Sequence, residues 1–341
     1  MTRSAEQAGI QAGDLSGMAA MNIAVNGFRD VSQENVDAAV SLVNGGTRYI
    51  TDQEATFMAG ALGITAQRVA QPFPSLPHVA YGTKYTAPAA SIPGANDCAV
   101  AYHPIEGSRI GRLGWGTSLG VPLTFGVLVR PTFNWTSYVS VNNGATANRA
   151  YLKRIFAPAD QDTFLPLWFE PDPAGSWLKD NGYGLALCFA LAAGSSRQAA
   201  AETWLNGTTA LAGADIANLT AVAGQSVTLS GLVMFPGIVP LSKETLPLIA
   251  RHVPDEEWLS KRYFEIGKID VLGTASGNLC GAIGPMVPKR SAPNLTYAST
   301  WSNGVTRGPV IRQVGLSSVQ IYASGPGSVE ESGNWTANAR M

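Results

Sequence analysis

The fold is indicated most clearly by the stretch Leu123-Thr124-Phe125-Gly126-Val127-Leu128-Val129-Arg130. Every second residue from Leu123 to Val129 is apolar, so these side chains share one face of an extended chain. Pro122 and Pro131 bracket the stretch and limit its length. The pattern predicts a β-strand with one face in a core.

Other strand-length runs follow the same logic, and turn signals separate them. We expect strands at residues 21–25, 47–51, 137–141, 164–169, 185–191 and 226–235. Runs 164–169 and 185–191 are almost continuously apolar, which is typical of inner strands. Residues 71–96 carry several prolines and are expected to be mostly loop or edge structure. Strand and turn signals over this length predict an all-β jelly-roll or other β-sandwich.

Helical signals are few. The best helix begins after Pro254, has acidic residues in its first turn, and has Gly267 as its expected cap. Residues 199–204 are alanine-rich and could form a short helical turn. Residues 313–323 are expected to form two short strands around Gly315.

These signals divide the chain into four parts. We expect an N-terminal attachment arm at residues 1–19, a jelly-roll β-sandwich at 20–253, a linker helix at 254–265, and a smaller C-terminal β region at 266–341.

Composition excludes several classes of function. Of the 341 residues only 14% are charged, and the net charge is −1. Without a basic patch, the sequence predicts neither nucleic-acid binding nor attraction to an anionic membrane. No apolar run is long enough for a membrane span, and no signal peptide is visible, so the chain is expected to fold in a cytoplasm. The 3 cysteines lie far apart and suggest no disulfide framework.

Enzyme signatures are missing from the sequence. It has no phosphate-binding loop, nucleophile elbow or zinc motif, and its 3 histidines are scattered singly. Two carboxylate pairs, Asp160 with Asp162 and Glu170 with Asp172, keep a polysaccharide-degrading activity open as an alternative. Because both pairs fall in turn-like sequence, we interpret them as solvated turn acids and expect no enzyme.

Aromatic residues beside loops rich in Asn, Ser, Thr and Gly indicate a different kind of site. Aromatic rings stack on the C–H faces of sugars, and neighbouring polar groups bind the hydroxyls. The candidate glycan-binding residues are Trp135, Tyr138, Trp177, Tyr183 and Trp204. The alternative for each tryptophan is a place in the sandwich core.

Several ordered pieces of the chain resemble a family of bacteriophage tail-fibre and head-spike structural proteins with a carbohydrate-binding-module-like jelly roll. The resembling pieces include Asn22-Ile23-Ala24-Val25-Asn26-Gly27-Phe28, Arg48-Tyr49-Ile50-Thr51-Asp52, residues 123–130, 184–187, 203–204 and 226–237, the helix 257–265, and segments 287–293 and 335–341. The chain departs from the family at Ser260-Lys261, where Cys-Gln is common, and at Gly126 and Val127, where a Trp is common nearby. Residues 145–175 show no resemblance.

The resemblance implies a subunit of a virion appendage, assembled in the cytoplasm of a bacterial host. It implies a symmetric homo-oligomer that attaches to other virion proteins through the N-terminal arm. It also implies binding to host capsule or lipopolysaccharide during adsorption. Some related jelly rolls hold a structural Ca²⁺ near the first strand, where the Gly27 carbonyl and an acid such as Asp30 or Glu106 would supply oxygen ligands. A capsid or baseplate decoration or scaffold protein without a ligand is the alternative, and a polysaccharide-degrading tailspike is a further one.

Overall fold

The computed structural model describes residues 12–144, 146, 148–207, 210–273, 277–283, 287–302, 307–313, 316–325 and 329–341. The chain forms two compact units, one ending at Glu256 and the other running from Glu257 to Met341. We call them the sandwich unit and the C-terminal unit. The boundary falls inside helix α4 (Val253–Lys261).

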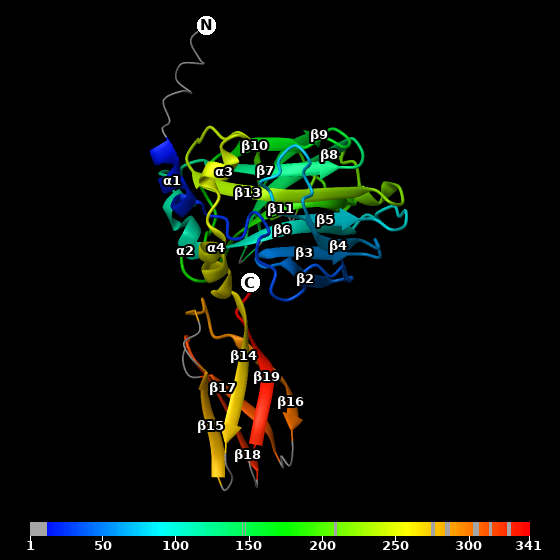
Figure 1. The fold of residues 1–341 in the computed structure, drawn as a ribbon. Helices are drawn as coiled ribbons and strands as arrows, with labels where there is room; N and C mark the ends of the chain where they lie inside the picture. Colours follow the sequence, from blue (N-terminus) through cyan, green and yellow to red (C-terminus); the bar gives the residue numbers. More distant parts are fainter. Residues whose placement is uncertain are drawn as a thin grey trace. The chain divides into compact units, whose positions relative to one another are not determined.

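The sandwich unit consists of two antiparallel sheets (Figure 1). The six-stranded sheet has the order β1 (Val40–Ser41), β4 (Thr65–Ala70), β5 (Tyr81–Thr86), β13 (Ser226–Pro236), β7 (Leu123–Pro131) and β10 (Thr163–Phe169). The seven-stranded sheet has the order β12 (Trp204–Asn206), β9 (Arg149–Ala157), β8 (Trp135–Asn143), β11 (Tyr183–Ala193), β6 (Cys98–Glu106), β3 (Glu54–Ala59) and β2 (Gly46–Thr51). The chain crosses repeatedly between the two sheets, and the fold is the expected all-β jelly-roll sandwich.

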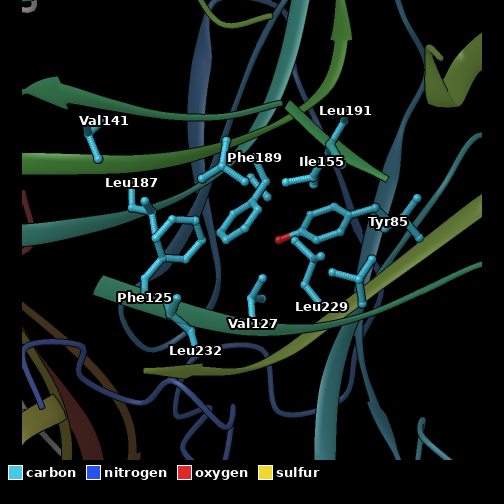
Figure 2. Packing of buried hydrophobic residues seen from close by; sticks show 14 of the residues in the cluster. Tyr85, Phe125, Val127, Val141, Ile155, Leu187, Phe189, Leu191, Leu229 and Leu232 are labelled. Atoms are coloured by element: carbon cyan, nitrogen blue, oxygen red, sulfur yellow. The ribbon is translucent and has the colours of Figure 1, made fainter. Parts of the chain in front are cut away.

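Alternation of apolar residues builds the core between the sheets. Figure 2 shows Phe125, Val127 and Leu229 from the six-stranded sheet packed with Leu187 and Phe189 of β11. Each of these side chains is at most 2% exposed. Burial of this kind contributes roughly 1.5–3 kcal/mol per large side chain, so this core is a large source of stability for the sandwich unit.

The segment from Asn22 to Asn26 is buried but forms no strand, so the prediction of a strand at 21–25 is wrong. Side chains replace the missing strand partners. Arg112, Arg251 and Arg109 donate to the carbonyls of residues 21–24, while His103 and Glu256 accept from the amides of Val25 and Asn26. A buried backbone needs such partners, and here tertiary contacts supply them.

Helices are short, and the described ones lie at the edges of the sandwich unit. They are α1 (Ala12–Met21), α2 (Gly107–Ile110) and α3 (Leu246–Ile249), besides α4. Helix α1 packs beside α3, so the second half of the expected attachment arm is helical, while residues 1–11 lie outside the described part. None of the described helices is long and apolar enough to cross a membrane.

The structure corrects four further expectations. Strand β10 is an edge strand rather than an inner one, and its Trp168 is 42% exposed. Strand β5 lies inside its sheet although it falls in the proline-rich segment 71–96. Residues 199–203 are irregular rather than helical and lead into β12. Gly267 lies in a strand and caps no helix, since α4 already ends at Lys261.

The C-terminal unit contains two three-stranded antiparallel sheets. One has the order β14 (Phe264–Gly273), β19 (Val329–Asn338) and β16 (Asn294–Ser302), and the other has β15 (Gly277–Ile283), β18 (Val319–Gly325) and β17 (Arg307–Gln313). The indole of Trp335 lies against Gly267, where a Cβ atom would come within 2.2 Å of the ring. The expected strands within residues 313–323 correspond to the end of β17 and to β18, while Gly315 lies outside the described residues.

Candidate functional site

A pocket of about 410 Å³ opens on the outer face of the seven-stranded sheet. We call it the outer-face pocket. Its lining residues are Thr47, Phe57, Cys98, Val100, Tyr102, Asn142, Asn143, Gly144, Tyr183, Ala186, Cys188, Arg197 and Leu211. They come from β2, β3, β6, β8 and β11 and from two loops.

Strand alternation explains the shape of this pocket. In β11 the large residues Leu185, Leu187 and Phe189 belong to the core, whereas the small residues Ala186 and Cys188 lie on the outer face. Small side chains on the outer face leave a depression over the middle of the sheet. The ring of Tyr183 lies over Gly144, where a Cβ atom would come within 2.4 Å of it.

The pocket floor continues across neighbouring strands in register. Phe57 is opposite Val100, and Tyr102 is opposite Cys188. The strands from β2 to β8 are five neighbours in the sheet, so the floor extends across about 19 Å at the usual strand spacing. This length suits an extended polymer better than a single small molecule.

Residues 194–207 and 210–217 form one wall of the pocket and cover the adjoining part of the sheet. Ala199 and Leu205 of this segment pack on a buried cluster that contains Leu152 and Ala190, while Arg197 and Leu211 reach the pocket. The Leu211 amide donates to the Arg197 carbonyl at 2.8 Å, which fixes these two residues together. The wall therefore belongs to the packed sandwich unit.

The lining is mainly apolar, with a few polar groups and a single charged side chain among the described residues. Burial raises the pKa of Tyr102, raises that of Tyr183 well above its ordinary value, and raises that of Cys188 to about 12. These groups therefore keep their protons at neutral pH and can act as donors. None of the described lining residues is acidic, and Arg197 is the only basic one. Hydroxyls, amides and aromatic rings together can bind neutral hydroxylated ligands.

Of the five aromatic residues predicted to bind glycans, Tyr183 lines the outer-face pocket. Trp135 is fully buried and belongs to the core, so its ring offers no face to a ligand. Tyr138 is 5% exposed beneath this wall of the pocket and donates to Asp215. The sequence interpretation missed Phe57, Tyr102 and Arg197.

Trp177 and Trp204 form an aromatic cluster with Trp115. Edge-to-face contacts join the three rings at centroid distances of 4.9, 5.4 and 5.9 Å. Trp177 is 7% exposed, and Trp204 is partly buried with its indole N–H donating to the Pro171 carbonyl. These tryptophans contribute to the packing of the sandwich unit, because their rings contact one another edge to face.

The four acids of the hydrolase alternative have separate environments. Asp172 is fully buried and pairs with Arg149, while it also accepts from the indole of Trp177 at 3.0 Å. Asp162 pairs with Arg130 at 2.6 Å. Asp160 and Glu170 are exposed. A carboxylate as enclosed as Asp172 is not available to a sugar bond.

The residues considered for Ca²⁺ have other partners. The Gly27 carbonyl accepts from the Leu232 amide and from the Arg29 guanidinium, each at 3.0 Å. Arg29 is itself buried and paired with Glu54 at 2.7 Å, so a cationic side chain already occupies this position. Glu106 accepts from the Ser108 hydroxyl, and burial raises the pKa of Asp30. Within the described residues no group of three or more His, Cys, Asp or Glu could hold a metal ion. These residues therefore do not fit a calcium site as they stand.

Comparison with known proteins gives structural similarity alone. No family model matches the chain, and no curated protein matches it. Similar solved structures include the enzymatically active domain of tailspike protein 4 from bacteriophage CBA120, with 11% identity, a TM-score of 0.32, and coverage of 64% of this chain and 22% of that one. The family 11 carbohydrate-binding module of a Clostridium thermocellum cellulosomal cellulase has 6% identity, a TM-score of 0.30, and coverage of 59% and 100%. The N-terminal part of xylanase 10B from the same organism, solved with xylohexaose, has 10% identity, a TM-score of 0.31, and coverage of 59% and 29%. The chain thus spans less than a third of the tailspike and xylanase chains.

Proposed function

We propose that this chain is a non-catalytic glycan-binding protein that binds an extended polysaccharide in the outer-face pocket. The observation that carries the proposal is the composition of that pocket. Tyr102 and Tyr183 supply aromatic surface, Asn142 supplies an amide oxygen that can accept, and the small residues Ala186 and Cys188 leave room in the middle of the floor. Each of these groups matches one part of a sugar: the C–H face, the hydroxyls and the ring volume.

We further propose that the chain acts as a subunit of a virion fibre or spike that binds host capsule or lipopolysaccharide. The support for this finer proposal is the ordered resemblance of segments such as 226–237 and 257–265 to phage appendage proteins. A symmetric homo-oligomer would present several pockets at once. Individually weak sugar contacts then add through high local concentration.

Single substitutions in the pocket test glycan binding. Tyr102→Ala removes an aromatic face and is expected to weaken polysaccharide binding roughly tenfold. Tyr102→Phe keeps the ring and removes only the hydroxyl, so its loss should be smaller. Trp168→Ala is the matched control, because Trp168 is exposed on β10 of the other sheet.

Binding is measured with purified protein of known oligomeric state against capsule polysaccharide and lipopolysaccharide extracted from candidate host bacteria, while polymer size is followed. Saturable binding that Tyr102→Ala weakens, with unchanged polymer, supports the proposal. Shortening of the polymer would replace it with the polysaccharide-degrading alternative. No binding to extracts or to a glycan array by the folded protein would favour a decoration or scaffold role.

A further inference from the structure

The outer face of the six-stranded sheet is covered at one end and open at the other. Phe73, Leu76 and Leu246, from the segments around 71–80 and 239–250, pack over Leu128 and Phe235 of the sheet. Beyond this apolar cover lies a groove of about 270 Å³ on the same sheet. We call it the basic groove. It belongs to a different sheet from the outer-face pocket.

Lys84, Thr228 and Arg130 lie side by side on three neighbouring strands across the basic groove. Lys84 of β5 is opposite Thr228 of β13, and Thr228 is opposite Arg130 of β7. Their neighbours Tyr85, Val227 and Val129 belong to the core, so alternation places all three on the outer face. At the usual strand spacing, the Cα atoms of Lys84 and Arg130 are about 10 Å apart. A group bound between them would contact the Thr228 position as well.

The walls of the groove combine hydroxyls with one apolar ring. Thr132 and Ser226 line it beside Thr228, and Pro72 closes one side. Pro72 lies over Gly82, where a Cβ atom would come within 2.9 Å of the proline ring and within 3.1 Å of Thr228. Glycine at this position therefore lets Pro72 pack tightly, and the groove keeps a defined edge.

The charges in the groove leave one positive charge uncompensated. Lys84 is exposed, and among the described residues no acid pairs with its ammonium group. Arg130 pairs with Asp162 at 2.6 Å. Although partial burial opposes ionisation, hydrogen bonds from Ser75 and the Arg130 guanidinium lower the pKa of Asp162, so this acid stays ionised at neutral pH. Two cations and one anion match a monoanionic group better than a dianion such as a phosphate monoester.

We propose that the basic groove is a second glycan site, specific for a sugar that carries a carboxylate, as in a uronic acid residue of an acidic polysaccharide. The carboxylate lies between Lys84 and Arg130, and the sugar hydroxyls bond Thr228 and its hydroxyl neighbours. The site is independent of the outer-face pocket, because it lies on the outer face of the opposite sheet.

The test is calorimetric titration of the whole protein with three probes: oligomers of galacturonate, of glucuronate and of alginate. Methyl-esterified oligogalacturonate is the uncharged control. We expect at least one acidic oligomer to bind. Its esterified or neutral counterpart should bind about tenfold more weakly, and added salt should weaken the binding of the acidic oligomer.

Variants separate this site from the outer-face pocket. Lys84→Ala should lower the affinity for the acidic oligomer about tenfold, whereas Lys84→Arg should retain most of that affinity. Lys179→Ala, at an exposed lysine outside the groove, should change nothing, and Tyr102→Ala should affect only the outer-face pocket. The proposal is overturned if none of the three oligomers binds, if esterification has no effect, or if Lys84→Ala binds like the unmodified protein. If the proposal for the outer-face pocket is wrong, the Tyr102 variants alone would show it, because they would then bind polysaccharide like the unmodified protein.

Discussion

The buried pair of Arg149 and Asp172 offers a direct test of how the aromatic cluster is held. Asp172 is fully buried, and its carboxylate accepts from the Arg149 guanidinium, from the Trp177 indole at 3.0 Å and from the Ala174 amide at 3.1 Å. Arg149 also lies over the Trp204 ring, with 5.3 Å between its guanidinium carbon and the ring centroid. Asp172→Asn keeps the size of the side chain and removes its charge.

The expected cost follows from leaving the Arg149 cation buried without a counter-ion. Removal of one partner from a buried ion pair costs about 3–5 kcal/mol. Urea denaturation measures this loss, and a slope of about 3 kcal/mol per molar suits a unit of this size. The midpoint should therefore fall by roughly 1–1.7 M. Because Trp177 and Trp204 contact the pair, tryptophan fluorescence follows the same transition.

Asp160→Asn is the matched control, since Asp160 is exposed and its substitution should change the free energy of unfolding by less than about 0.5 kcal/mol. A loss below about 1 kcal/mol for Asp172→Asn would refute the reasoning. It would mean that other contacts, such as the one from Arg149 to Asn206, already satisfy the guanidinium. Adding Arg149→Met to Asp172→Asn should recover part of the loss, because the uncompensated charge is then removed.

Three further predictions concern other buried groups. Burial and nearby arginines hold the pKa of His103 well below its ordinary value, so below about pH 6.5 the unfolded chain takes up a proton that the native state does not. As the pH is lowered, the free energy of unfolding should then fall by up to about 1.4 kcal/mol per pH unit. The same measurement on His103→Gln should lack this decrease, and an equal dependence on pH in the variant would contradict the prediction. Gly27→Ala places a Cβ atom 1.9 Å from the Leu232 carbonyl oxygen and should lower the melting temperature by more than 5 °C, whereas Gly17→Ala, with nothing within 4 Å, should leave it nearly unchanged. Cys98 and Cys188 line the outer-face pocket, but they are only 1% and 6% exposed and burial raises the pKa of each thiol. After alkylation at pH 8, mass spectrometry of peptides should therefore show both far less labelled in native than in unfolded protein, and equal labelling would refute this.

The strands that the sequence predicted are those in which local pattern and tertiary role agree. Strand β7 alternates cleanly because one face of it packs in the core, whereas the alternation of β13 shifts by one residue at the irregularity between Ser230 and Val233. The segment 21–25 has strand-like composition, yet arginine side chains from distant parts of the chain satisfy its backbone. Such partners leave no local periodicity. Strand β5 was hidden by surrounding prolines that lie in its flanking loops.

The candidate site was predicted only in part for a similar reason. The signal of aromatic residues near polar loops selected Tyr183, which lines the outer-face pocket, but it also selected Trp135, which is a core residue. The informative feature was the alternation of small and large residues in β11, with Ala186 and Cys188 between leucines and a phenylalanine. Small residues on one face mark a depression in a sheet. Which aromatic residues surround it depends on strand order, and no local sequence pattern gives that order.

The arginine-held segment at the start of the sandwich unit also has a consequence for how the unit assembles. The Asn26 amide bonds Glu256 across 230 positions in the chain, and Arg251 bonds the carbonyls of Asn22 and Ala24 from a similar distance. The Asn26 amide and the carbonyls of Asn22 and Ala24 therefore remain without these partners until the last residues of the unit have been synthesised. Contacts of such long range slow folding, because the unit must lose the entropy of closing a very long loop before these contacts form. A nascent chain that stops before Arg251 would leave the carbonyls of Asn22 and Ala24 without this partner, so nearly the entire unit must leave the ribosome before these contacts can form.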